Sequence, residues 1–162
     1  MTVKEDRDIF EQKLQVEAKA SKEQIPDKEA AWEAERKKAK PDLNVKFIYA
    51  YVLTMSNSER HKSMGMRLLN ELIAARFNVE ECLYALAVCL YSQTEWRECR
   101  EVVDRLLRLN PDHRYGNELH LFVKDAQAKQ DLAIGVGVGV GVIGATAAIL
   151  LGAMLGSGRR GR

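Results

Sequence analysis

The sequence is poor in cysteine and proline, with three residues of each in a chain of 162. An odd number of cysteines without a C-x-x-C pair argues against a disulfide framework and against a zinc ribbon. The prolines, Pro26, Pro41 and Pro111, are far apart and leave long stretches in which helices can form without interruption. Because the cysteines do not indicate a disulfide framework, we expect the chain to reside on the reducing side of a membrane.

The chain also lacks a strong charge of either sign, since 25 lysines and arginines face 23 aspartates and glutamates. Three of the positive charges belong to Arg159, Arg160 and Arg162 at the end of the sequence, and the rest of the chain has no excess of positive charge. Nucleic-acid binding needs such an excess on one surface. The sequence therefore predicts no nucleic-acid partner.

Residue patterns for catalysis are absent as well. The three histidines have no metal-ligand spacing, and the three cysteines fall at packing positions of the expected helices. No glycine-rich loop precedes a Lys-Ser or Lys-Thr pair, so no phosphate-binding cradle is expected. We expect a protein that is not an enzyme and that has no catalytic residues, cofactor, metal or small-molecule substrate.

The stretch Leu132–Gly156 contains no charged side chain. A helix of this length, at about 1.5 Å per residue, exceeds the hydrocarbon core of about 30 Å. We expect residues 131–156 to form a transmembrane tail anchor that is inserted after synthesis. Residues 1–130 would then stay in the cytosol, and residues 157–162 would form a basic stub beyond the membrane.

Seven of the 11 glycines lie within this uncharged stretch. Part of it matches G-x-G-x-x-G, but the strand before it and the acidic residue after it that a dinucleotide site requires are missing. Small residues spaced by four allow membrane helices to approach closely. A self-associating face of Gly135, Gly137, Gly139 and Gly141 is therefore one interpretation. The other is that glycine only keeps the span mildly apolar.

The first 41 residues are rich in charge and contain few apolar side chains. Phe10 and Leu14 have helical spacing, but so few apolar residues cannot stabilise an isolated helix of this length. We expect residues 1–24 to be a charged arm, either mobile or docked on another surface. The next helix is predicted to begin at Ile25–Asp27, with proline at its first position, and to end before Pro41.

Residues 42–130 have helical periodicity throughout, and no alternating pattern predicts a strand. The pattern predicts helices over 42–55, 59–76, 79–92, 95–109 and 113–129. Residues 82–91 are all non-polar or aromatic, too few to span a bilayer and too continuous for a helix with one buried face. The helix over 79–92 must therefore be covered on most sides.

Two of the expected helix pairs have the spacing of a 34-residue helix-turn-helix repeat. With Pro111 as its last landmark, one repeat places Ala87 and Cys99 at the small-residue positions 8 and 20. The preceding repeat places Gly65 at position 20, and Ala50 at position 8 if its turn is three residues longer. Since two repeats are rarely stable alone, the flanking helices should act as caps. The sequence predicts an all-α bundle of two tetratricopeptide-like hairpins with capping helices, followed by a C-terminal transmembrane helix.

This organisation resembles the mitochondrial fission 1 protein family, the tail-anchored adaptors of mitochondrial and peroxisomal division. The resemblance is carried by Phe47–Leu53, Tyr84–Val88, Leu106–Pro111 and Glu118–Asp125, followed by the glycine-rich span and its basic stub. It implies a location on the mitochondrial outer membrane, and also on peroxisomes, with the helical domain in the cytosol. It further implies recruitment of a dynamin-related GTPase, directly or through an adaptor protein. The arm of residues 1–24 is longer than is usual in the family, so its effect on partner access is not carried over.

In such repeats the first helix of each pair lines a concave face through positions 2, 5, 9 and 12. These positions hold Asn44, Phe47, Tyr51, Thr54, Glu81, Tyr84, Val88 and Tyr91. Their aromatic and aliphatic side chains predict an apolar groove for a partner helix or an extended segment. Alternatively, some of them pack against a capping helix or against the protein's own arm. These first helices offer no cationic clamp for a terminal carboxylate, so chaperone docking is not expected.

The residue patterns favour a membrane-tethered interaction module, and the resemblance implies that this module promotes organelle fission. The alternative is a tail-anchored structural or tethering protein whose anchor self-associates into an oligomer and that has no role in division. Arg159, Arg160 and Arg162, next to a mildly hydrophobic span, favour mitochondria as the destination.

Overall fold

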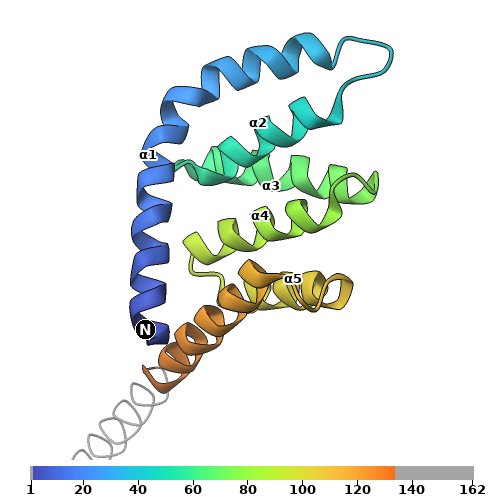
Figure 1. The fold of residues 1–162 in the computed structure, drawn as a ribbon. Helices are drawn as coiled ribbons and strands as arrows, with labels where there is room; N and C mark the ends of the chain where they lie inside the picture. The colour runs from blue at the N-terminus through green and yellow to red at the C-terminus, as the bar shows by residue number, and fades with distance from the viewer. Residues whose placement is uncertain (1, 134–162) are drawn as a thin grey trace, which may run out of the picture. The chain divides into compact units, whose positions relative to one another are not determined.

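The computed structural model describes residues 2–133, which form helices joined by turns, with no strand among them. The helices are α1 (Val3–Glu35), α2 (Leu43–Met55), α3 (Glu59–Ala74), α4 (Val79–Ser92), α5 (Trp96–Leu109) and a further helix over residues 114–133 (Figure 1). Residues up to 124 belong to one compact unit, and residues from 125 on belong to a second. The packing described below is that of the first unit.

The four predicted helices between residues 42 and 109 are confirmed, with ends that agree within two residues. Local signals explain these ends. The Asp42 side chain caps α2, because its Oδ1 accepts a hydrogen bond of 2.8 Å from the Asn44 N–H. Beyond α3, Arg76 and Asn78 have φ angles of 56° and 40°, in the left-handed region that ends helices. Thr94, with φ of 60°, makes the corresponding turn after α4.

The helix α4 is covered on most sides, as the continuous apolar run predicted. Its buried residues are Cys82, Leu83, Ala85, Leu86, Ala87, Val88, Cys89 and Tyr91. By contrast, α5 buries Cys99, Val102, Val103 and Leu106 and exposes its charged face. The centre of the core therefore lies around α4.

The two hairpins α2–α3 and α4–α5 close around small residues at the predicted repeat positions. In the first hairpin, a Cβ atom built on Gly65 would lie 2.8 Å from the carbonyl oxygen of Ala50, so the two backbones are in direct contact. In the second, the Cys99 Sγ donates a hydrogen bond of 3.1 Å to the carbonyl oxygen of Ala87. Both alanines are fully buried. The small-residue pairing of the two repeats is thus confirmed.

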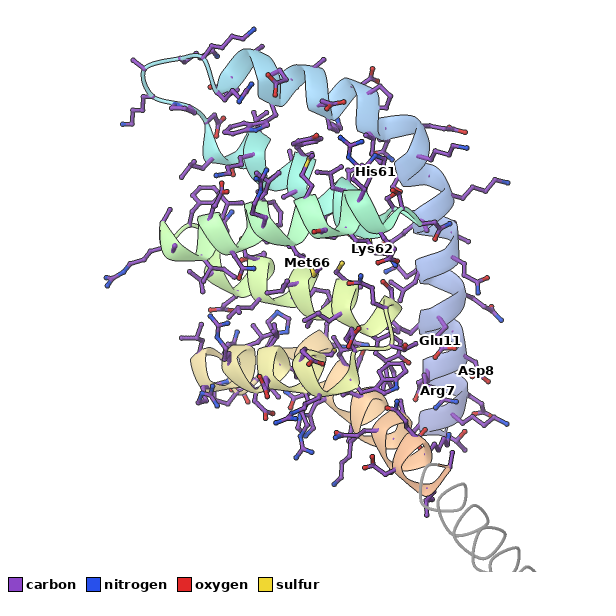
Figure 2. All side chains as sticks on the ribbon, turned by 180° about the vertical axis from the view of Figure 1, so that it is seen from behind. Arg7, Asp8, Glu11, His61, Lys62 and Met66 are labelled. Carbon is purple, nitrogen blue, oxygen red and sulfur yellow. The ribbon has the colours of Figure 1, made fainter. Side chains whose placement is uncertain are left out.

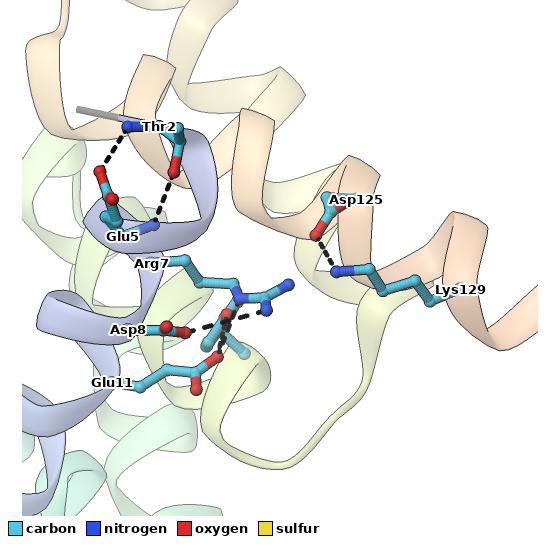
Figure 3. Close-up of polar contacts among 8 residues, drawn as sticks. Thr2, Glu5, Arg7, Asp8, Glu11, Asp125 and Lys129 are labelled. Atoms are coloured by element: carbon cyan, nitrogen blue, oxygen red, sulfur yellow. Dashed lines mark hydrogen bonds and ion pairs between the residues drawn. The ribbon is translucent and has the colours of Figure 1, made fainter.

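The prediction that a helix begins at Ile25–Asp27 is wrong, because α1 begins at Val3. A capping box starts it: Thr2 Oγ1 accepts the Glu5 N–H at 3.4 Å, and the Thr2 N–H donates to Glu5 Oε2 at 2.8 Å (Figure 3). Residues of the expected arm therefore form the first half of α1.

The helix α1 bends between its two halves, and the second half lies beside α2 (Figure 1). Pro26 lies inside the helix, where it removes a backbone donor and clashes with the preceding turn. Ser21 adds to the bend, since its Oγ donates to the Ala18 carbonyl at 2.9 Å. Ser21 and Ile25 are the buried residues of α1. Pro26 thus bends a continuous helix instead of starting one.

The end of α1 also differs from the prediction, because the helix stops at Glu35 rather than just before Pro41. The Glu35 carboxylate binds Lys38 Nζ at 2.6 Å and accepts the Asp42 N–H at 2.8 Å. These two bonds lower the pKa of Glu35, and they tie the intervening turn to the start of α2.

No helix within residues 2–133 is both long enough and apolar enough to cross a membrane. Residues 134–156 of the expected anchor lie outside the described residues. The basic stub over 157–162 lies outside them as well. The same holds for the anchor and targeting residues Gly135, Gly137, Gly139, Gly141, Arg159, Arg160 and Arg162.

Candidate functional site: a groove lined by α2 and α4

The residues predicted for the concave face come from α2 and α4, and their exposure divides them into three groups. Asn44 and Glu81 are exposed, while Phe47, Tyr51 and Tyr84 are half-buried. Thr54, Val88 and Tyr91 are buried. The structure thus brings Tyr51, Tyr84, Val88 and Tyr91, together with Met55, to one surface, which is called the groove below.

The first half of α1 covers the groove. Phe10 packs edge-on against Tyr91, with ring centroids 5.5 Å apart, and lies equally close to Phe122. Leu14, from the same half of α1, lines two neighbouring clefts, and Met55 and Val88 of the groove line both of these clefts as well. The predicted alternative, in which groove residues pack against the protein's own arm, is therefore what the structure shows for Tyr91.

Two tyrosine–glutamate hydrogen bonds fasten α1 to the groove. The Tyr91 hydroxyl donates to Glu11 Oε1 at 2.8 Å, and the Tyr51 hydroxyl donates to Glu17 Oε2 at 3.2 Å. Burial, together with the nearby Glu17 carboxylate, raises the pKa of Tyr51 to about 12. Burial and Glu11 raise the pKa of Tyr91 as well. Both hydroxyls therefore remain protonated donors at physiological pH.

A cleft of about 680 Å³ stays open beside α1. It lies between the first half of α1, the groove and residues 114–122, and Tyr84 and Tyr51 form part of its wall. Its apolar rim consists of Val3, Ile9, Tyr115 and Leu121, each about half exposed. Partly exposed apolar side chains gathered around a cleft are typical of a protein interaction site. This space is called the open cleft below.

Tyr84 is held in the open cleft by aromatic neighbours. Its ring centroid lies 5.6 Å from that of His113 and 6.0 Å from that of Tyr115. Burial raises the pKa of Tyr84 to about 12. His113 is fixed in turn, because its Nδ1 accepts the Gly116 N–H at 2.9 Å at the start of the 114–133 helix. Tyr84 therefore presents a well-positioned ring to the open cleft.

A second cleft, of about 430 Å³, lies beside α1 and is lined by the last residues of α2 and α4. It contains Lys62, which comes from α3 and is buried. Lys62 is not among the predicted groove residues, because those come from the first helix of each pair. Nothing in the local sequence pattern distinguishes this lysine from the exposed ones nearby.

Three of the predicted groove residues line neither cleft: Asn44, Phe47 and Glu81. Phe47 packs beside Tyr51, with ring centroids 6.4 Å apart. Thr54 lines the smaller cleft, but its Oγ1 donates to the Tyr51 carbonyl at 2.7 Å. Thr54 thus has its hydroxyl occupied within α2.

Within residues 2–133 no three side chains of His, Cys, Asp or Glu are grouped so that they could hold a metal ion. The three cysteines are buried and free. Burial raises the pKa of Cys82 to about 11 and that of Cys89 and Cys99 to about 12. These thiols are packing groups and not accessible nucleophiles.

No protein-family model matches the chain. Curated relatives do match it. A mitochondrial fission 1 protein from Yarrowia lipolytica is 31% identical over 119 residues, which cover 73% of this chain and 76% of that protein. A mitochondrial fission 1 protein from Tuber borchii is 34% identical over 119 residues, covering 72% of this chain and 74% of that one. The chain belongs to the mitochondrial fission 1 protein family.

The family's fold is also found here. The crystal structure of fission protein Fis1 from Saccharomyces cerevisiae matches with a TM-score of 0.53 and 20% sequence identity. The match covers 76% of this chain and 87% of the yeast chain. Family membership and the all-helical fold therefore agree with the resemblance inferred from the repeat spacing.

Proposed function

We propose that this chain is an adaptor in mitochondrial fission. In this proposal it sits on the mitochondrial outer membrane, and also on peroxisomes, and recruits a dynamin-related GTPase directly or through an adaptor protein. Membership of the mitochondrial fission 1 protein family supports a role in division. The mechanism is capture of the partner in the groove and the open cleft, with the helical domain in the cytosol.

One observation supports this mechanism above the others: the groove already holds a helix, the first half of α1. Phe10 and Leu14 pack on Tyr91, Met55 and Val88. A surface that accepts the apolar side of one helix can accept a similar partner segment. The open cleft beside α1 offers room for such a segment, with Tyr84 as its aromatic anchor.

In this proposal the predicted anchor holds the groove at the membrane surface. Holding the helical domain on one membrane raises the effective concentration of the groove for a partner that reaches that membrane. The uncharged residues Leu132–Gly156 support such an anchor, and the three arginines beyond them support a mitochondrial destination. We expect the full chain to stay in the membrane pellet after alkaline carbonate extraction. Release into the supernatant would contradict an integral anchor.

The targeting role of Arg159, Arg160 and Arg162 is tested by replacing all three with serine in a fluorescent fusion. We expect the fusion to leave mitochondria, because the positive charge next to the mildly hydrophobic span is removed. Unchanged mitochondrial fluorescence would contradict this role.

Partner capture is tested with a matched pair of leucine variants and a purified dynamin-related GTPase, with or without its adaptor. Leu121→Arg places a charge on the rim of the open cleft, where Leu121 is 51% exposed. Leu109→Arg makes the same change at the end of α5, where Leu109 is 58% exposed and lines neither cleft. We expect the first variant to weaken capture about tenfold and the second to leave it unchanged.

Tyr84→Arg extends this test into the wall of the open cleft and should also weaken capture. Circular dichroism checks that the helices remain folded. Equal capture by the wild-type chain, Leu121→Arg and Tyr84→Arg would contradict the proposed surface. Cells that lack the chain should have elongated mitochondria or enlarged peroxisomes. Unchanged organelle morphology would instead favour a tethering protein with no role in division.

A further inference from the structure

The Lys62 side chain is buried, and among residues 2–133 its ammonium group has one anionic partner, the Glu59 carboxylate. Lys62 is the one charged residue that is buried in the part of the chain that the structure describes. Its side chain is 9% exposed, and its Nζ lies 3.8 Å from Glu59 Oε1. That distance is too long for a hydrogen bond. Glu59 is itself 74% exposed, and its Oε2 accepts a hydrogen bond of 2.7 Å from Gln93 Nε2.

Burying an ammonium group is costly unless an anion or several acceptors surround it. Lys62 also lies in the first turn of α3, where the helix dipole adds positive potential. Ser58, which caps α3, makes no side-chain hydrogen bond to that turn. The surroundings of Lys62 therefore favour an additional anionic group within reach of Nζ.

The cleft of about 430 Å³ gives such a group access to Lys62. Figure 2 shows Lys62 on α3 and Glu11 on α1, and these two are the charged residues that line the cleft. The Glu11 carboxylate is already engaged, since it accepts the Tyr91 hydroxyl at 2.8 Å and lies 3.6 Å from Arg7 Nε. Glu11 therefore does not add a second carboxylate to Lys62 beside that of Glu59.

Apolar and polar side chains complete the walls of this cleft. Met55 and Trp96 supply apolar surface, and Tyr91 packs edge-on against Trp96 with ring centroids 5.0 Å apart. Asn57 and Thr94 add polar groups at the edge. A ligand that fits this lining has a carboxylate next to an apolar side chain.

We propose that this cleft binds an acidic side chain of a partner segment, with its carboxylate on Lys62 Nζ and an adjacent apolar residue against Met55 and Trp96. The inference rests on the proposed function only in taking the ligand to be part of a partner protein. A single lysine supplies one point charge, which suits one side-chain carboxylate. A chain terminus would call for several cationic donors, and Lys62 is the one cationic residue among those that line the cleft.

The test uses the full chain in detergent micelles, with ¹⁵N-labelled tryptophan, and two blocked tetrapeptides as probes. One has the sequence Ala-Glu-Leu-Ala, and the other replaces glutamate by glutamine. The chain has two tryptophans, so Trp96 reports on the cleft. Trp32, which lies elsewhere beside Lys46, serves as an internal control. We expect the Trp96 indole signal to shift at about tenfold lower concentration of the glutamate peptide.

Lysine variants identify the group that reads the carboxylate. Lys62→Met keeps the buried stem and removes the charge, so the chain should stay folded and the preference for glutamate should disappear. Lys62→Arg should retain the preference. The matched control is Lys46→Met: Lys46 is also largely buried, but its Nζ binds Glu71 Oε2 at 2.7 Å and it does not line the cleft. That variant should keep the tenfold difference.

Three results would overturn the proposal. The first is equal affinity of the wild-type chain for the two peptides, and the second is a glutamate preference that persists in Lys62→Met. The third is an equally strong response to the glutamine peptide with a free carboxyl terminus, which would assign the cleft to a chain end. None of these measurements uses the division machinery, so failure here is distinct from failure of partner capture in the Leu121→Arg comparison.

Discussion

The hydroxyl of Tyr91 donates a hydrogen bond of 2.8 Å to Glu11 Oε1, which joins residues 80 positions apart. This bond connects the end of α4 to the first turns of α1. Near it, Phe10 packs on the Tyr91 ring, and Tyr51 holds Glu17 one turn and a half further along. A small set of contacts thus keeps the first half of α1 on the groove, while the second half is packed against α2.

The first prediction concerns the strength of this attachment. Phe10→Ala removes the aromatic contacts with Tyr91 and Phe122, each of which contributes about 0.5–1.5 kcal/mol beyond its buried area. We expect amide hydrogen exchange in residues 3–17 to become about tenfold faster or more, because this half of α1 opens locally. Amides of α4 should keep their protection.

The control for this prediction is Val16→Ala on the same helix, because Val16 is 70% exposed. It should leave exchange in residues 3–17 close to the wild-type rate. If Phe10→Ala accelerated amide hydrogen exchange in α4 as much as in residues 3–17, the two segments would unfold together. That result would contradict separate opening of the first half of α1.

The second prediction concerns the contact between α2 and α3 at Gly65. A Cβ atom at this position would lie 2.7 Å from Thr54 Cγ2 and 2.8 Å from the Ala50 carbonyl oxygen. Gly65→Ala gains about 1 kcal/mol of helix propensity but overpacks two backbones that cannot easily separate. We expect a net loss of about 1–3 kcal/mol in the free energy of unfolding, measured by urea denaturation.

Ser63→Ala is the matched control, since Ser63 is exposed on the same helix. It should leave the urea midpoint nearly unchanged. A midpoint of Gly65→Ala at or above that of the wild-type chain would show that α2 and α3 are not packed as closely as Gly65 and Ala50 indicate.

The hairpins could be predicted because their signals are local. Periodicity sets α2 to α5, and Pro111 fixes a repeat that places Gly65 and Cys99 opposite Ala50 and Ala87. The two residues of each pair lie less than one repeat length apart in the sequence. Short-range patterns therefore contain most of the information needed for the pair of hairpins.

The first half of α1 could not be predicted in the same way. Its stability depends on Tyr51 and Tyr91, which are distant in the sequence, and the spacing of Phe10 and Leu14 was the one local hint. Proline is typical of a helix start, but within a long helix it produces a bend, as Pro26 does in α1. No local pattern predicts the burial of Lys62, because burial of a lysine depends on tertiary packing.

The third prediction concerns the thiols of Cys82, Cys89 and Cys99. All three are buried, and their pKa values are raised to about 11, 12 and 12. The thiolate is the reactive form, so Ellman's reagent at pH 8 should modify none of them quickly in the folded chain. All three should react in concentrated guanidinium chloride.

Ser63→Cys provides the positive control, because it adds a thiol at an exposed position of α3. This variant should release one rapid equivalent of chromophore in the folded state. A rapid equivalent from the wild-type chain would mean that at least one native cysteine is accessible, and it would remove the assignment of these residues to packing.

The last prediction follows from Tyr51 and Tyr84, whose pKa values are raised to about 12 by burial. In the unfolded chain a tyrosine loses its proton near pH 10. Between about pH 10 and 12 the unfolded state therefore binds fewer protons than the folded state, and the free energy of unfolding falls as the pH rises. Below this range these tyrosines contribute no pH dependence.

We expect Tyr51→Phe to reduce the fall in the free energy of unfolding by about 1 kcal/mol or less, given partial solvent screening of a half-buried hydroxyl. Urea denaturation of the wild-type chain and of Tyr51→Phe at pH 8 and pH 11 measures this difference. Equal declines in the two chains would show that the Tyr51 hydroxyl is not held in its protonated form by the groove and Glu17.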